Sequence, residues 1–159
     1  PQMACLTDLR FSGTRAGRDA SLAVASALKN NSMITKLDLA DNAFFKEGGE
    51  ALAVAIKTMP NLRHLSLRDG SLENGAVVAL GHAIAAVCPP LVHLDLSGNE
   101  LGADPEDEGE DGCVENSAAF AALQVAILGV ASSLEVLMLE DNELGSMAAT
   151  LVTPLTQCS

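Results

Sequence analysis

One short phrase recurs along the chain at a nearly fixed spacing, and it constrains the fold more than any other feature. The phrase has apolar residues at its first, fourth and sixth positions, as in ITKLDL at 34–39 and LVHLDL at 91–96. Successive copies begin 28, 28, 29 and 43 residues apart, at Leu6, Ile34, Leu62, Leu91 and Leu134. A phrase that returns at such an interval indicates a repeated structural unit.

A second phrase follows the first in four of these units and keeps the same spacing. It reads AVASAL at 23–28, ALAVAI at 51–56, ALGHAI at 79–84 and ALQVAI at 122–127. Alanine stands at its first and fifth positions, and an aliphatic residue stands at its second and sixth. Residues four apart lie on one face of a helix. Each unit is therefore predicted to be a short strand, a turn and a helix, and stacking of units buries the apolar faces.

The two phrases in phase resemble the long form of the leucine-rich repeat. The resemblance implies an α/β fold, a horseshoe-shaped solenoid of about five 28–29-residue units that is ribonuclease-inhibitor-like. We expect a single domain over residues 1–159, as part of a longer array. The long last interval predicts an acidic inserted loop at 102–117, where turn formers and carboxylates concentrate.

The charge of the chain restricts its partners. Its net charge is −12 and its pI is about 4.4, which disfavours nucleic acid and anionic membranes and favours a basic protein partner. No apolar run reaches the roughly 18 residues of a membrane span, and no signal-peptide pattern opens the sequence. The four cysteines form no CxxC pair. We expect them to be reduced and the protein to be cytoplasmic, with nuclear-envelope association possible only through other regions.

The sequence contains no recognisable catalytic or cofactor motif. It has no GxxxxGK[ST], HExxH or GxSxG pattern, so we expect a non-catalytic protein without a cofactor. His64 and His93 occupy the same position in neighbouring units and are expected side by side on the sheet. Two imidazoles without a third ligand do not predict a metal site. His82 is expected on a helix surface, and Cys88 is expected to be packed.

The candidate partner-binding residues lie between and just after the strand leucines. Side chains at these positions are predicted to project from the strand face or from its rim. The candidates are Asp38, Asp41, Asn42, Arg68, Asp69, Asp95, Glu100 and Asp141. Two alternatives stay open at this point: the charges keep the array soluble, and the asparagines at 42, 99 and 142 satisfy backbone groups in each turn.

Longer motifs resemble one particular group of leucine-rich-repeat proteins. The segments KLDLADNAFFKEGGEALAVAIK at 36–57 and PNLRHLSL at 60–67 are similar to Ran GTPase-activating proteins of the plant and green-algal type. The resemblance covers residue 4 to about 145. It implies activation of GTP hydrolysis by the small GTPase Ran, which directs nucleocytoplasmic transport. An acidic rim residue of that family matches Asp41, and Arg15 and Arg18 are candidates for catalytic support.

A second hypothesis assigns the chain no role in GTP hydrolysis. It is then a leucine-rich-repeat interaction scaffold or a subunit of a larger assembly. The five units and the acidic insertion favour this alternative, because members of the Ran-activating family are expected to have about eleven units. The two hypotheses differ in a measurable way, since the first predicts binding to Ran-GTP that weakens with salt.

Overall fold

The computed structural model describes residues 5–101, 109–145 and 147–152. Short strands and helices alternate along the whole described chain, as the two repeated phrases predict. In chain order they are β1 (Asp8–Arg10), α1 (Arg18–Leu28), β2 (Lys36–Asp38), α2 (Phe45–Ile56), β3 (His64–Ser66), α3 (Asn74–Val87), β4 (His93–Asp95), α4 (Gly109–Val130), β5 (Val136–Met138) and α5 (Met147–Val152).

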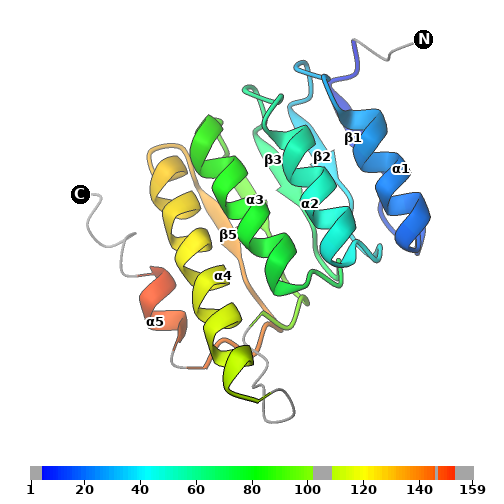
Figure 1. Cartoon of the computed structure of the whole chain (residues 1–159). Helices are drawn as coiled ribbons and strands as arrows, with labels where there is room; N and C mark the ends of the chain where they lie inside the picture. Colours follow the sequence, from blue (N-terminus) through cyan, green and yellow to red (C-terminus); the bar gives the residue numbers. More distant parts are fainter. Residues whose placement is uncertain (1–4, 102–108, 146, 153–159) are drawn as a thin grey trace.

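The five strands form one parallel sheet in sequence order, β1-β2-β3-β4-β5. Equivalent positions of the first phrase pair across the sheet, so that Leu37 is opposite Leu65 and Leu65 is opposite Leu94. In Figure 1 the helices lie side by side on one face of this sheet. The helix-free face is called the open face below. This arrangement is that of an α/β repeat array, while the horseshoe curvature and the ribonuclease-inhibitor-like form stay predictions.

The core lies between the sheet and the helix layer. Leu37, Leu65 and Leu94 of the central strands are at most 1% exposed, because their side chains point towards the helices. Leu52 and Ile56 of α2 are both 0% exposed, which confirms that the second phrase supplies the helix face of the core. The alternation of apolar and polar residues along each strand therefore separates the core from the open face.

Small residues allow the helices to pack closely. A Cβ on Gly49 of α2 would lie 2.3 Å from the Cβ of Ala76 in α3. One on Gly81 of α3 would lie 2.7 Å from the backbone of Ala122 in α4. The alanine positions of the second phrase are not buried in every copy, since Ala23 and Ala27 of α1 are exposed. In the described structure α1 has a neighbouring helix on one side only.

The acidic insertion differs from the loop expected at 102–117. Residues 102–108 lie outside the described part of the chain, but α4 begins at Gly109 and continues to Val130. The prediction of a loop is therefore wrong from residue 109 onwards. Its basis was composition, and carboxylates near the start of a helix are compatible with the helix dipole. Helical structure thus reaches back from the apolar phrase at 122–127 into the acidic segment.

Two further expectations concern single side chains on the helix side. Cys88 is exposed rather than packed, because it caps α3 in a left-handed conformation with φ 45°. Its thiol donates to the Ala85 carbonyl oxygen at 3.0 Å. His82 is exposed on α3, as expected. Within the described chain, no helix has both the length and the apolar character that a bilayer crossing requires.

Candidate functional site

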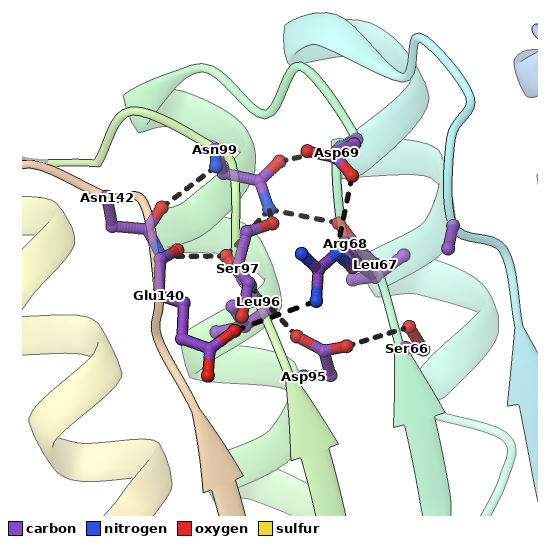
Figure 2. Close-up of polar contacts among 12 residues, drawn as sticks. Ser66, Leu67, Arg68, Asp69, Asp95, Leu96, Ser97, Asn99, Glu140 and Asn142 are labelled. Carbon is purple, nitrogen blue, oxygen red and sulfur yellow. Dashed lines mark hydrogen bonds and ion pairs between the residues drawn. The ribbon is translucent and has the colours of Figure 1, made fainter.

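Buried asparagines form a hydrogen-bonded ladder just beyond the carboxyl ends of the strands. Asn99 is 4% exposed. Its Nδ2 donates to the carbonyl oxygens of Leu67, Leu96 and Ser97 at 2.9, 2.8 and 3.2 Å. Its Oδ1 accepts from the backbone N–H groups of Gly70 and Leu72 at 3.0 and 3.2 Å. Each such asparagine therefore joins its own unit to the preceding unit (Figure 2).

The ladder confirms the structural interpretation of the asparagines. Asn42 is 2% exposed and Asn142 is 1% exposed. Asn42 Nδ2 donates to the Phe11 and Leu39 carbonyl oxygens at 2.8 and 3.0 Å, and Asn142 Oδ1 accepts from Asn99 N at 2.9 Å. Asn42 was also a candidate for partner binding. The Asn42 amide is buried and makes its hydrogen bonds inside the protein. The side chain of that turn that a partner can reach is therefore Asp41, which is exposed.

Four exposed carboxylates, here called the acidic rim, follow the strands at the same edge of the sheet. They are Asp41, Asp69, Glu100 and Asp141. All four residues adopt a left-handed backbone conformation, with φ between 50° and 54°. Aspartate tolerates this conformation better than most side chains do. The turn geometry thus gives one reason for aspartate here, and the gathering of negative charge at one edge is its consequence.

Two further carboxylates stand on the open face itself. Asp38 is half-buried, and its Oδ2 accepts from Ser12 Oγ at 3.1 Å. Asp95 is 6% exposed, and its Oδ1 accepts from the Ser97 backbone N–H at 3.0 Å. Both side chains come from the column that the sequence predicts for the middle of the strand face. Asp95 is the less accessible of the two.

Arg68 crosses the open face beside the acidic rim. Its guanidinium lies 3.4 Å from the Asp69 carboxylate and 3.7 Å from the Glu140 carboxylate. In Figure 2, Arg68 and Glu140 point towards each other across the strand that carries Ser97. Ser97 is fully buried, and within the described structure its Oγ has no hydrogen-bond partner. The positive charge of Arg68 offsets the negative charge of Asp69, and the other three carboxylates of the rim keep it negative.

Imidazole and basic side chains gather near the amino ends of the strands. His64 and His93 are opposite each other in β3 and β4, with ring centroids 6.0 Å apart, which confirms their predicted neighbourhood. Lys36 is opposite His64 on the other side, and Arg63 precedes it in the chain. Partial burial lowers the pKa of His64, and the charges of Lys36, His93 and Arg63 lower it further, while Asp8 opposes them.

Lys36 and Arg63 did not emerge as candidates from the sequence. The repeat spacing could have identified Lys36, because it occupies the same column as the two histidines. What the sequence does not reveal is that neither cation forms an ion pair within the described residues. That property depends on where the chain places its carboxylates in space.

The two arginines considered for catalytic support are placed differently. Arg15 is exposed in the turn after β1, with φ 49°. Arg18 begins α1, and its guanidinium lies 2.9 Å from the Glu47 carboxylate and 5.4 Å from the centre of the Phe45 ring. Arg18 is thus held between α1 and α2, whereas Arg15 has a free-standing position near Asp41, whose carbonyl oxygen accepts from the Arg15 N–H at 3.1 Å.

The residue types needed for a metal centre are present but dispersed. Among the residues that the structure describes, no three or more His, Cys, Asp or Glu side chains converge in a way that holds a metal ion. The histidine pair accordingly remains a two-membered group on the open face. The chemistry available at this surface is electrostatic and hydrogen-bonding recognition.

Comparison with known proteins agrees with the repeat architecture. A family model described as Leucine Rich repeat matches residues 30–53 and 87–104, which include β2 and β4. The chain thus carries leucine-rich repeats. It is similar to the monocyte differentiation antigen CD14 of Oryctolagus cuniculus, with 34% identity over 119 residues, or 71% of this chain and 30% of that protein.

Two further relatives carry the same name. Monocyte differentiation antigen CD14 of Bos taurus is 34% identical over 117 residues, and that of Homo sapiens is 33% identical over 117 residues. Each match covers 70% of this chain, and the chain spans about 30% of the length of these curated relatives. These similarities support leucine-rich repeats and do not identify a Ran GTPase-activating protein.

Proposed function

We propose that this chain is a non-catalytic protein-interaction scaffold that binds a basic partner protein through the acidic rim and the adjoining open face. The observation that carries the proposal is the gathering of four exposed carboxylates at one edge of a sheet face that no helix of the described residues covers. Repeat arrays generally use such extended surfaces for binding. A positively charged surface complements the rim and is steered towards it by the net charge of −12.

A matched pair of triple variants tests the location of binding. The rim variant combines Asp41→Asn, Asp69→Asn and Asp141→Asn, which remove charge while asparagine tolerates the left-handed backbone. The control combines Asp19→Asn in α1, Glu50→Gln in α2 and Glu73→Gln at the amino-terminal cap of α3, which remove the same charge from exposed positions outside the rim. The rim variant is expected to lose affinity for a basic partner at least about threefold more than the control does. Equal losses would mean that net charge, rather than the rim, determines binding.

Ran-GTP is the specific partner that the sequence resemblance suggests. Asp41 supports this candidate, because it is exposed in the turn that carries the L-D-L-x-D-N motif. Binding is expected to weaken with salt and to be reduced in the rim variant. No measurable binding of Ran-GTP at low ionic strength would refute this candidate and leave the scaffold proposal standing. The relatives named as monocyte differentiation antigens favour a recognition role outside GTPase regulation, as the competing possibility.

The absence of catalysis is also part of the proposal. GTPase activation requires groups that position the attacking water or stabilise charge on the transferred phosphoryl group. Arg18 forms an ion pair with Glu47 and lies over the Phe45 ring. In the turn between β1 and α1, Arg15 is the exposed arginine without such contacts among the described residues. Single-turnover GTP hydrolysis by Ran, with this chain in excess, is expected to be unchanged. An acceleration of about 10³ or more would contradict the proposal, and Arg15→Ala would then be the first variant to measure.

A reducing, cytoplasmic environment completes the proposal. Cys5 and Cys88 are exposed free thiols, and such thiols persist where glutathione and thioredoxin keep cysteines reduced. Thiol labelling of the protein isolated from cells under acid quench tests this point. Rapid labelling of both cysteines is expected, and blocked or disulfide-bonded cysteines would place the protein in an oxidising compartment instead.

A further inference from the structure

Opposite charges are separated across the open face. Near the carboxyl ends of the strands stands the acidic rim. Near their amino ends stand the side chains that we call the basic patch. They are Lys36, His64 and His93, which share one column of the open face, and Arg63, which precedes His64 and whose charge helps to lower the pKa of that imidazole. Along one strand the two regions are about five residues apart, as His64 is from Asp69, which corresponds to roughly 17 Å of extended chain.

The basic patch lacks internal neutralisation. Three of the arginines, Arg10, Arg18 and Arg68, are ion-paired within the described structure. Lys36 and Arg63 are exposed, and neither forms an ion pair with the described residues. The nearest carboxylate across the register is Asp8, which is opposite Lys36 but is engaged by Arg10 at 3.3 Å. In a chain of net charge −12, these two unpaired cations at the amino ends of the strands offer a local site for a carboxylate.

The imidazoles extend this patch over two strands. Across the sheet, His64 of β3 lies between Lys36 of β2 and His93 of β4. The residue opposite His93 on β5 is the uncharged Val136. The three central positions lie on adjacent strands, so together they span about 10 Å across the sheet. The groups that act on His64 are Lys36 of β2, His93 of β4 and Arg63 in its own segment, with Asp8 of β1 opposing them. A carboxylate placed here meets the charges of Lys36 and Arg63 and the imidazoles of two neighbouring strands.

These observations indicate in which orientation a partner segment lies on the open face. The inference rests on the function proposed above. We infer that the open face binds one segment of a partner protein in a single orientation, with an acidic side chain on the basic patch and basic side chains on the acidic rim. A purely acidic segment is repelled by the rim and by the net charge. A purely basic segment is repelled by Lys36 and Arg63 if it extends along the strands. A segment that carries both charges about five residues apart satisfies both regions.

Three labelled peptides and fluorescence anisotropy at low salt test this inference. The block peptide has three lysines, a Gly-Ser-Gly spacer and three glutamates. The alternating peptide has the same composition with lysine and glutamate interleaved, and the third peptide is hexalysine. The block peptide is expected to bind at least about threefold more tightly than the alternating peptide. Equal affinities of the two would overturn the inference.

A double variant locates the acidic end of the peptide. Lys36→Met with Arg63→Met removes both charges from exposed positions and keeps unbranched side chains. It is expected to weaken the block peptide at least about threefold and to leave hexalysine equally or more tightly bound. Equal weakening of both peptides would overturn the inference, because the basic patch would then have no selective role.

The His64 imidazole gives an independent readout by NMR. A carboxylate on the basic patch favours the charged imidazolium, so the block peptide is expected to raise the pKa of His64 from its lowered value. Hexalysine is expected not to raise it. An unchanged His64 titration at saturating block peptide would overturn the inference, even if binding were measured. The failure of the proposed function has a different signature, since hexalysine would then bind the rim variant as tightly as the wild type.

Discussion

Removal of the Asn99 side chain is expected to lower stability substantially. Asn99 is 4% exposed and makes five hydrogen bonds with buried backbone groups of two units. In Asn99→Ala the Leu96 carbonyl oxygen keeps its bond from Asn142 Nδ2 at 2.9 Å, and the Ser97 carbonyl oxygen keeps its bond from the Asp69 N–H at 2.9 Å. The other three groups, the Leu67 carbonyl oxygen and the N–H groups of Gly70 and Leu72, lose the bond that Asn99 supplies.

The magnitude follows from those three groups. A buried polar group that loses its partner costs about 1–3 kcal/mol, and partial relaxation favours the lower end of that range. We therefore expect Asn99→Ala to lower the free energy of unfolding by about 3 kcal/mol. A small domain has roughly 5–15 kcal/mol in total, so a large fraction of its stability is removed. Urea unfolding followed by far-UV circular dichroism measures the difference, and a loss below about 1 kcal/mol would refute the role of the ladder.

Asn99→Asp separates the acceptor from the donor function of the same side chain. An aspartate keeps an oxygen for the Gly70 and Leu72 N–H groups, but it places a carboxylate against the three carbonyl oxygens that Nδ2 serves. This repulsion raises the pKa of the new carboxyl group in the folded state. The variant is therefore expected to be least stable at neutral pH and to recover, relative to wild type, as the pH falls through that raised pKa. A pH-independent difference would contradict the donor assignment.

Three further comparisons use matched positions. Ile56→Ala, at a side chain that is 0% exposed, is expected to cost about 2–5 kcal/mol, whereas Val54→Ala at 45% exposure costs much less; equal losses in urea would mean that the register of α2 is wrong. Ser21→Ala removes a hydroxyl that donates to a carbonyl oxygen at 2.8 Å and is expected to cost about 1 kcal/mol. Ser97→Ala removes a hydroxyl that has no partner among the described residues and is expected to cost nothing. Thermal unfolding that ranks the two variants the other way would contradict both assignments. Because the pKa of His64 is lowered in the folded state, the protein loses stability as the pH falls below the unfolded-state pKa of about 6.5. His64→Gln is expected to reduce this loss in urea titrations. An unchanged pH dependence of stability would contradict the lowered pKa.

The repeat spacing predicts most of the fold because register and burial follow directly from it. The column Leu37, Leu65 and Leu94 pairs and is buried as the first phrase predicts. The alanine phrase predicts helix packing but not which copies have neighbours on both sides, and this explains the exposed Ala23 in α1. Composition misleads over the acidic insertion, because helix α4 already begins at Gly109.

The candidate surface is predictable by position but not by side-chain environment. Asp41 and Asn42 are adjacent in the sequence, yet the first is exposed and the second is 2% exposed. The left-handed backbone at Asp41 turns the two side chains in different directions, and no local pattern of polarity encodes that difference. Likewise, the reach of Arg68 to Glu140 and the unpaired state of Lys36 depend on distances between units.

Chemical-shift mapping of the hexalysine complex by amide NMR tests the central claim most directly. If the acidic rim is the binding surface, the largest changes will fall on Asp41, Asp69, Glu100 and Asp141 and on their neighbours at the carboxyl ends of the strands. The exposed positions Asp19 of α1, Glu50 of α2 and Glu73 at the cap of α3 will then change little, although they carry the same charge. Shifts of equal size on the helix layer would contradict the account, because binding would then follow net charge and not the surface that the repeat creates.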